Sequence, residues 1–241
     1  MLEYFPEGFL KNRLMNKGYR VMGPVWQSWL RRSMSAPGTR LERLGSDYGG
    51  WYFPVDVARP DWIIYSGGVG QDSSFDEAVM ERFGCTVHMF DPTPHAIEHV
   101  EARKALNAAL TKHAVFKPVG LWRENTTLKF FAPRTNGWVG SFSVRNLQGM
   151  EDYFDAPCRS IPSLMQELGH DRIDFLKLDI EGAEYDVIRS CLRAPIPIAW
   201  IAVEFDQPVP VWTTQALIGE LRERDYSLVH VDRWNFLFRH G

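Results

Sequence analysis

Strand-like and helix-like segments alternate along most of this 241-residue chain, and this alternation is what most restricts its fold. Short apolar runs, which indicate buried strands, occur at 62–66, 86–90, 115–119, 173–180 and 198–205. Strands that alternate with helices form a mainly parallel sheet covered on both faces. Two final runs, 227–231 and 235–239, are joined by a short turn. We therefore predict an α/β fold whose sheet ends in an antiparallel hairpin.

The predicted helices begin at capping or proline residues. Ser73 or Ser74 caps a helix that continues through Arg82, and the turn at 92–94 begins a helix that reaches about Leu110. Two further helices are predicted at 183–192 and 213–224. The less regular segments 128–132 and 140–144 are expected to form extra strands or a flap over the sheet, and 47–54 to form a tight turn that leads into a short aromatic strand.

The N-terminal part differs in charge from the rest. Residues 1–43 carry eight basic and three acidic side chains, a net charge of +5, which leaves −8 for the remainder of a chain whose total is −3. We therefore divide the chain into a basic, aromatic arm with a short hairpin, residues 1–58, and an α/β domain, residues 59–241. The arm is expected to pack on its own acidic body or on a second copy in a homo-oligomer. The alternative is peripheral contact of residues 9–32 with an anionic membrane. The acidic remainder argues against nucleic acid as a partner.

The sequence shows no features of export or membrane insertion. Its apolar runs are shorter than the roughly 18 residues that a membrane span needs. The first residues carry acids where a signal peptide has basic residues. The three cysteines, Cys85, Cys158 and Cys191, are odd in number and widely spaced, so we expect no disulfide framework and no cysteine-based zinc site. We expect a cytoplasmic protein.

A glycine loop follows the first strand of the α/β domain. Gly67, Gly68 and Gly70 let the backbone turn sharply and approach a ligand at a helix N-terminus. Asp91 ends the next strand, where a carboxylate can bind both hydroxyls of a ribose. Together they predict a site for an adenosine-containing cofactor. The alternative is that the glycines serve only steric needs and Asp91 caps a helix.

The residues after the glycines favour one such cofactor. Ser73 stands where the dinucleotide fingerprint has its third glycine, and the acid Asp72 precedes it. A carboxylate repels a pyrophosphate but attracts a sulfonium or an ammonium group. No Tyr-x-x-x-Lys pair of the short-chain dehydrogenases occurs in the chain. These features favour S-adenosylmethionine over a nicotinamide dinucleotide.

An acidic cluster follows a later strand. Asp179, Glu181 and Glu184 come in quick succession after it, and Glu204 and Asp206 end the strand that follows. Because carboxyl ends of parallel strands bind ligands, the two groups are expected to converge on a substrate hydroxyl or a divalent cation. The candidate metal ligands are Asp179, Glu204 and Asp206. For Glu184 we favour the role of an acid at a helix N-terminus.

The sequence KLDIEGAEYDVI at 177–188 resembles the signature of FkbM-type methyltransferases. The glycine loop, FDPTP at 90–94, GSFS at 140–143 and FLFR at 236–239 follow in the family's order, and the resemblance extends from about residue 45 to the end. It implies a Rossmann-like class I methyltransferase fold with a seven-stranded sheet. It also implies S-adenosylmethionine as cofactor and O-methylation of a hydroxyl on a sugar, glycan or natural product. The Gln71-Asp72 insertion departs from the family's commonest loop.

The resemblance and the residue-level argument together give one set of site residues. By the resemblance, Gly67, Gly70 and Asp91 hold the cofactor, while Asp179 and Glu181 lie near the transferred methyl. The full cofactor set that we expect is Gly67, Gly68, Gly70, Asp72, Asp91, Pro92, Gly120 and Asp179. Asp179 is the expected catalytic base, assisted by Glu181 or Glu204, and Trp138 is a candidate to line the acceptor pocket.

Three other functions compete with this interpretation. The first is a non-catalytic module that binds S-adenosylmethionine, and the second is an NAD-dependent oxidoreductase. The third is a zinc peptidase, since His95 and His99 fit the H-x-x-E-H pattern. The sequence offers no distant third ligand for that zinc, so we place this function last.

Overall fold

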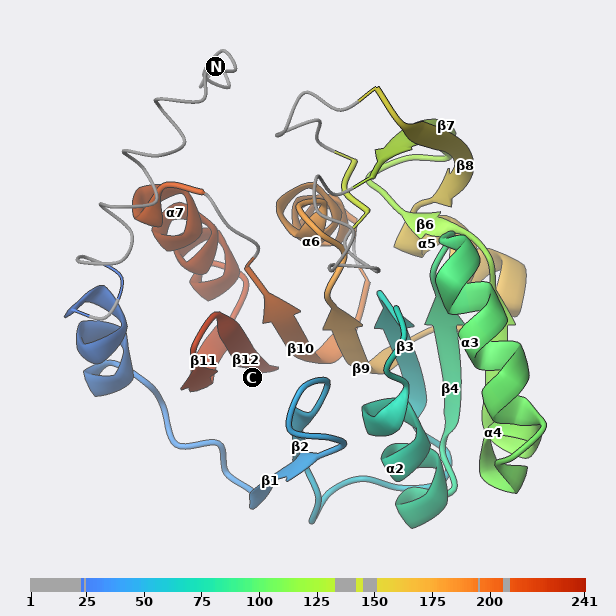
Figure 1. Ribbon diagram of the computed structural model, residues 1–241. Helices are drawn as coiled ribbons and strands as arrows, with labels where there is room; N and C mark the ends of the chain where they lie inside the picture. The colour runs from blue at the N-terminus through green and yellow to red at the C-terminus, as the bar shows by residue number, and fades with distance from the viewer. Residues whose placement is uncertain (1–22, 24, 133–141, 145–150, 195, 206–208) are drawn as a thin grey trace.

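The computed structural model describes residues 23, 25–132, 142–144, 151–194, 196–205 and 209–241 (Figure 1). Its main sheet has seven strands in the order β11-β12-β10-β9-β3-β4-β5. The strands are β3 (Ile63–Gly67), β4 (Thr86–Phe90), β5 (Ala114–Lys117), β9 (Ile173–Leu178), β10 (Ile198–Glu204), β11 (Tyr226–Asp232) and β12 (Asn235–His240). The five strands from β10 to β5 are parallel, and β12 lies antiparallel between β10 and β11. The predicted α/β sheet with its C-terminal hairpin is confirmed.

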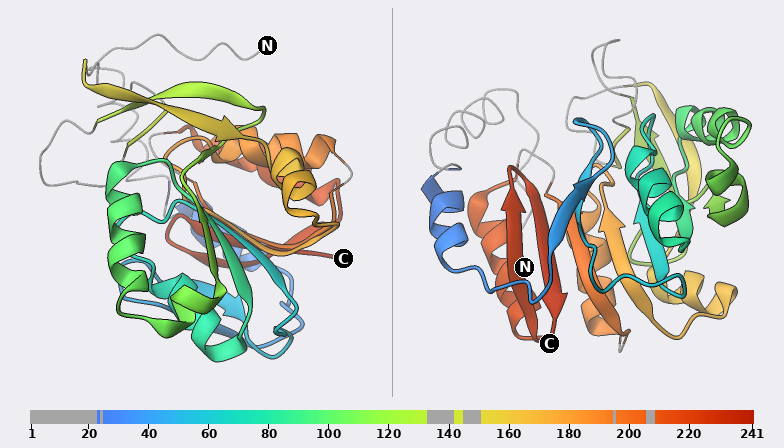
Figure 2. Two further views of the ribbon diagram at one scale, coloured as in Figure 1. Left: turned by 90° about the vertical axis from the view of Figure 1, so that its right-hand side faces the viewer. Right: turned by 90° about the horizontal axis from the view of Figure 1, so that it is seen from below.

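Helices cover both faces of this sheet (Figure 2). One face carries α5 (Ile161–Leu168), α6 (Glu184–Arg193) and α7 (Val211–Arg222), and the other carries α2 (Ser74–Phe83), α3 (Pro94–Lys104) and α4 (Ala108–His113). Each face has its own apolar core. Strands β9 and β3 lie in the middle, and all six residues of β9 are buried. Four of its six residues are apolar, as expected for a strand buried on both faces, and the charged Asp174 and Lys177 are buried among them.

Two helices differ from the sequence prediction. The helix expected to reach Leu110 ends at Lys104, because Asn107 begins α4 by accepting hydrogen bonds from the backbone N–H groups of Ala109 and Leu110. Helix α5 was not predicted. Its signals are present in the sequence, since Ser160 caps its first turn and Gly169 ends it with a left-handed backbone.

The hairpin of β1 (Leu41–Leu44) and β2 (Trp51–Pro54) packs into the core on the α2 face. The ring of Phe53 lies 5.8 Å from that of Trp62 and 4.9 Å from that of Phe175, which belongs to the central strand β9. The predicted turn and aromatic strand at 47–54 are thus confirmed, and the hairpin shares a core with the sheet. The division of the chain at residue 58 stays a prediction.

The described part of the N-terminal arm is a helix at 25–32 that packs beside α7. Leu30 is fully buried, and the indole of Trp26 stacks on Trp234 at 6.1 Å and donates a hydrogen bond to Gln215. This part of the arm therefore lies on its own body, as we expected. Contact of residues 9–32 with a membrane stays a prediction. Within the described residues, no helix is long and apolar enough to cross a membrane.

A second, smaller sheet lies over the carboxyl-end edge of the main one (Figure 1). It consists of β6 (Gly120–Leu121), β7 (Thr126–Phe131) and β8 (Tyr153–Arg159) in the order β6-β8-β7. Strand β7 confirms the extra strand predicted at 128–132. Ser143 forms a backbone bridge with Phe131, and residues 140 and 141 of the segment predicted at 140–144 fall outside the described residues.

His88 on β4 makes the stability of the fold depend on pH. Its side chain is buried between Tyr65 and His170, and burial, followed by the charges of His170 and Lys117, lowers its pKa from 6.5 to about 4. The unfolded histidine therefore binds a proton at a pH where the folded one does not. Its contribution to stability is complete above pH 6.5 and is lost as the pH falls toward about 4.

We expect His88→Phe to remove this dependence. Between pH 6.5 and about 4, the free energy of unfolding of the wild type should fall by about 3 kcal/mol more than that of the variant. Urea titrations at a series of pH values measure the difference, and His240→Gln, at an exposed position, serves as the control. Parallel pH curves for the wild type and His88→Phe would contradict the assignment.

Candidate functional site

The sheet has one topological switch point, between β3 and β9. From β3 the chain proceeds outward through β4 and β5, and from β9 it proceeds through β10 in the opposite direction. Diverging connections leave a crevice at the carboxyl ends of the two central strands, where ligands of open α/β sheets bind. The glycine loop leaves β3 at this point, and Asp179 directly follows β9.

The glycine loop is pressed against the end of β9. Gly68 has a φ of 78°, and a Cβ placed on it would lie 1.6 Å from the carbonyl oxygen of Asp179. The backbone N–H of Asp179 donates a hydrogen bond of 3.1 Å to the carbonyl of Gly67. Gly70 also has a positive φ, of 54°, but a Cβ there would meet nothing within 4 Å. The loop therefore needs glycine for packing at 68 and is open to a ligand at 70.

Asp91, at the end of β4, shapes this loop through both carboxylate oxygens. Oδ2 accepts hydrogen bonds of 2.9 Å from the backbone N–H groups of Val69 and Gly70. Oδ1 accepts from the backbone N–H and the hydroxyl of Thr93, at 2.8 and 2.6 Å. Four accepted bonds use the capacity of one carboxylate. A ribose hydroxyl would have to displace one of these donors, so the ribose contact stays a prediction.

Asp72 joins the glycine loop to the β1–β2 hairpin. One carboxylate oxygen accepts a hydrogen bond from the hydroxyl of Ser46, and the other accepts one of 2.9 Å from the backbone N–H of Ser74, where α2 begins. Ser73, one of the two predicted caps, is the N-cap residue of α2, but its side chain makes no capping hydrogen bond and its hydroxyl donates instead to Glu77. Burial raises the pKa of Asp72, but hydrogen bonds led by that of Ser46 outweigh it and lower the pKa overall. Its predicted contact with the cofactor stays a prediction.

A buried lysine lies beneath the crevice. Lys177 on β9 is 4% exposed, and its ammonium donates hydrogen bonds to the carbonyls of Gly68 and Gly67, at 2.7 and 3.4 Å. Burial raises the pKa of two nearby carboxyls, Asp76 on α2 and Asp179, and the charge of Lys177 opposes this rise. Buried charges persist where they are paired and hydrogen-bonded. Lys177 therefore holds the glycine loop by hydrogen bonds and places a positive charge near the acids around it.

The carboxyl of Asp179 has a raised pKa. Burial raises its pKa above 3.8, and the charge of Asp91 raises it further against the opposing effect of Lys177. A carboxyl whose pKa lies closer to the working pH is a better general base. The backbone thus holds Asp179 at the switch point, and its surroundings raise the pKa of its carboxyl.

The turn after Asp179 is strained and held by a buried acid. Glu181 has a φ of 53°, in the left-handed region that side chains rarely adopt. Glu184 is fully buried and accepts hydrogen bonds from the backbone N–H groups of Ile180 and Gly182, at 2.8 and 3.0 Å. Glu184 therefore fixes the turn at the start of α6, in agreement with the structural role that we favoured for it.

The charges of four candidate acids act on one hydroxyl, that of Tyr48 in the β1–β2 turn. Protein around this hydroxyl raises its pKa, and the charges of Asp179, Glu181, Glu204 and Asp72 raise it further. These acids come from the ends of β9 and β10 and from the glycine loop. Asp179 and Glu204 follow the paired residues Leu178 and Val203, so the ends of β9 and β10 lie side by side, and a joint role of the two acids stays a prediction. Tyr48 was not predicted as a site residue, although its place in the glycine-flanked turn DYGGW was a signal.

The other predicted site residues lie at the edge of this arrangement or beyond it. Pro92 follows Asp91 and is partly buried. A Cβ on Gly120 would lie 2.8 Å from the sulfur of Cys158, so packing within the small sheet requires this glycine. Asp206 and Trp138 fall outside the described residues. In the part of the chain that is described, no group of three or more His, Cys, Asp or Glu side chains could hold a metal ion.

The two histidines of the H-x-x-E-H pattern have other partners. His99 lies 2.9 Å from the hydroxyl of Ser73, and burial lowers its pKa. The ring of His95 lies 6.3 Å from that of Phe142. Both rings are therefore in contact with neighbouring side chains on the α3 side of the loop.

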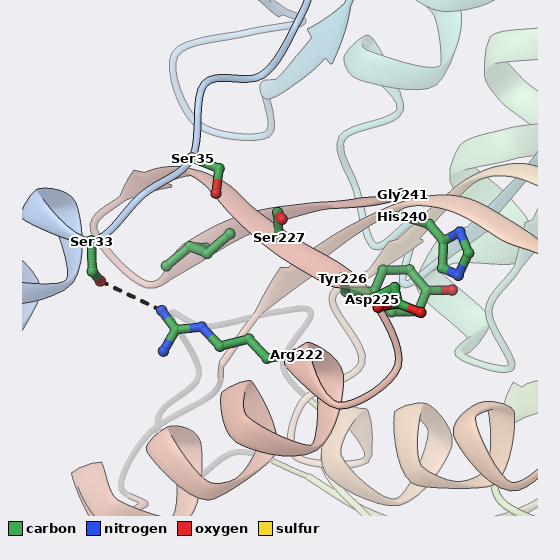
Figure 3. Close-up of a pocket in the computed structure, with 9 residues that line it drawn as sticks. Ser33, Ser35, Arg222, Asp225, Tyr226, Ser227, His240 and Gly241 are labelled. Carbon is green, nitrogen blue, oxygen red and sulfur yellow. Dashed lines mark hydrogen bonds between the residues drawn. The ribbon is translucent and has the colours of Figure 1, made fainter.

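A polar hollow of about 530 Å³ lies far from this crevice (Figure 3). It is at the opposite edge of the sheet, because the end of β12 pairs with the beginning of β10. Its lining residues are Ser33, Ser35, Arg222, Asp225, Tyr226, Ser227, Leu228, His240 and Gly241. It contains none of the candidate site residues, so the crevice at the switch point remains the candidate site.

The sequence profile of the Methyltransferase FkbM domain matches residues 66–228. This chain belongs to the FkbM methyltransferase family. The match begins at the end of β3 and includes the glycine loop, Asp91 and the signature at 177–188. The glycine loop and the ends of β4, β9 and β10 therefore lie within the matched region.

Relatives agree with this assignment. The chain is 24% identical over 182 residues to probable methyltransferase-like protein 24 of Rattus norvegicus and 24% identical over 184 residues to that of Homo sapiens. Each match covers 69% of this chain but 42% of the relative, so the chain spans less than half the length of these curated relatives. The solved structure of Methyltransferase FkbM from Methylobacillus flagellatus KT superposes with a TM-score of 0.51 at 17% identity, over 78% of this chain and 46% of that one. The fold is the Rossmann-like class I methyltransferase fold.

Proposed function

We propose that this FkbM-family domain is an S-adenosylmethionine-dependent O-methyltransferase that acts on a hydroxyl of a sugar, glycan or other small molecule. One observation carries the proposal: Asp179, whose pKa is raised, is held against the glycine loop at the switch point of the sheet. The family match supports methyl transfer as the reaction class. The acceptor class rests on the resemblance described above and on the need of an alcohol for a base.

The residues of the crevice suit this cofactor. Gly70 leaves open space in front of the loop, so a ligand can approach its backbone closely. Asp72, Asp179, Glu181 and Glu204 give the region a negative charge, which favours a sulfonium and an ammonium group and disfavours the pyrophosphate of NAD. When bound, S-adenosylmethionine supplies an electrophilic methyl group. Asp91 and Lys177 would keep the loop in the shape that receives it.

The protein contributes alignment and proton removal. An in-line transfer depends on holding the acceptor oxygen opposite the methyl group, and alignment supplies a large share of the rate. In this proposal the carboxylate of Asp179 accepts the proton of the acceptor hydroxyl, with Glu181 or Glu204 assisting. A divalent cation held by Asp179, Glu204 and Asp206 is the alternative means of lowering the pKa of that hydroxyl.

Calorimetric titration tests the proposed cofactor. We expect the purified chain to bind S-adenosylmethionine and S-adenosylhomocysteine with micromolar affinity and to show no heat of binding with NAD. Repeating the titrations after chelation tests the metal, and an acceptor screen over glycans and hydroxylated metabolites tests turnover. Absence of binding to both sulfur nucleotides, with and without metal, would refute the proposal. Binding without methyl transfer to any acceptor would favour a non-catalytic module.

A further inference from the structure

The β1–β2 turn is built against the glycine loop. The backbone N–H of Ser46 donates a hydrogen bond of 2.7 Å to the hydroxyl of Ser74, and the Ser46 hydroxyl donates to Asp72. A Cβ placed on Gly49 would lie 2.7 Å from the carboxylate carbon of Asp72, so only glycine fits this approach. The turn is therefore fixed to the loop that forms one wall of the crevice.

Tyr48 is at the tip of this turn and is 88% exposed. Its backbone is well held, since the guanidinium of Arg43 donates hydrogen bonds to the carbonyls of Ser46 and Asp47, at 2.7 and 2.9 Å. The side chain itself has no such packing. A large ring left in water on a fixed backbone, at the mouth of a ligand site, is available to cover a ligand.

The charge around Tyr48 restricts which ligand group it can cover. Asp72 lies directly against this turn, 2.7 Å from a Cβ placed on the neighbouring Gly49, and the charges of Asp179, Glu181 and Glu204 also act on the Tyr48 hydroxyl. An anionic group is repelled from such a place and a cationic group is attracted. The face of a tyrosine ring also attracts cations, through the negative charge of its π electrons. Both properties select a positive group.

We propose that the ring of Tyr48 covers the sulfonium of S-adenosylmethionine and so makes this site bind the charged methyl donor more tightly than its neutral product. This inference rests on the proposed function. S-adenosylhomocysteine retains the ammonium group but lacks the sulfonium charge, so the two compounds differ at the group that Tyr48 is inferred to contact. Loss of this attraction after transfer would also favour release of the product.

The test compares two variants with two ligands by calorimetric titration. We expect Tyr48→Ala to weaken binding of S-adenosylmethionine by about 5- to 30-fold and binding of S-adenosylhomocysteine by less than about twofold. Tyr48→Phe keeps the ring and should remain within about twofold of the wild type for both compounds. Trp29→Ala, which removes another exposed ring on the helix at 25–32, is the control and should change neither affinity.

The outcomes separate this inference from the proposed function. An equal loss for both compounds in Tyr48→Ala, or no loss for either, would overturn the role of the ring while leaving the cofactor in place. A loss in Tyr48→Phe equal to that in Tyr48→Ala would assign the effect to the hydroxyl and overturn the contact through the ring. Failure of the wild type to bind either compound would overturn the proposed function, and this inference with it. Because Tyr48 and Trp29 are both exposed, the thermal unfolding temperatures of Tyr48→Ala, Tyr48→Phe and Trp29→Ala should match that of the wild type.

Discussion

A Gly68→Ala variant is expected to lose about 2 to 4 kcal/mol of stability and to bind S-adenosylmethionine at least about 100-fold more weakly. The added Cβ would lie 1.6 Å from the carbonyl oxygen of Asp179 and 2.6 Å from its carbonyl carbon. Both are backbone atoms at the end of a central strand, so no side-chain rotation can relieve the clash. The loop must move away from β9, and the crevice changes shape with it.

Gly169→Ala is the matched control for this substitution. Gly169 ends α5 with a φ of 71°, close to the 78° of Gly68, but a Cβ there meets nothing within 4 Å. The Gly169→Ala variant should therefore lose only about 1 kcal/mol of stability, from the left-handed strain of alanine, and its cofactor binding should be unchanged. Urea denaturation and calorimetric titration measure the two effects. Equal losses of stability in the two variants, with unchanged binding in both, would show that the loop does not depend on its contact with β9.

The sequence predicts the parts of the site that depend on local patterns. The alternation of strands and helices places the ends of β3, β4, β9 and β10 at one edge, because parallel strands share their direction. The glycine loop after β3 and the acids after the other strands can therefore be placed at one edge of the sheet without knowledge of side-chain contacts. Asp179 and Glu204 therefore follow paired residues of neighbouring strands, Leu178 and Val203, while their convergence on a substrate or a cation stays a prediction.

Contacts between distant segments could not be predicted in this way. Asp72 was assigned to the cofactor from its charge, yet its partners include Ser46, which is 26 residues away and belongs to a hairpin outside the alternating pattern. Tyr48 was overlooked for the same reason, since only the packing of that hairpin brings it to the acids. Lys177 was noted only as part of a motif, because its partners Gly68 and Asp76 lie on other elements.

Asp91 shows how one pattern can satisfy two explanations. A carboxylate at the end of the second strand predicts ribose binding, and the alternative was a role in local structure. The structure gives Asp91 four backbone and hydroxyl donors, which shape the glycine loop and the start of α3. Asp91 lies beside the glycine loop, as we expected, and its contact with a cofactor stays a prediction, because a ligand would have to displace one of those donors.

Asp179→Asn is expected to reduce turnover by about 100- to 10,000-fold while cofactor affinity stays within about threefold of the wild type. Asparagine has nearly the same shape, so the backbone contacts with Gly67 and Gly68 are preserved, but its amide cannot accept a proton. Turnover is measured as formation of S-adenosylhomocysteine with the acceptor that the wild type methylates. Glu204→Gln is the matched control, because it removes another acid near the same tyrosine hydroxyl, and its loss should be less than about 10-fold.

The pH dependence of kcat/KM provides a second test of this assignment. A base acts as the carboxylate, so activity should decline as the pH falls through the pKa of Asp179, which burial and Asp91 place above 3.8. This acidic limb should disappear from the residual activity of Asp179→Asn and persist in Glu204→Gln. If Asp179→Asn keeps more than about a third of the turnover, or keeps the same limb, another group removes the proton. A limb that then disappears in Glu204→Gln would move the chemistry to the end of β10.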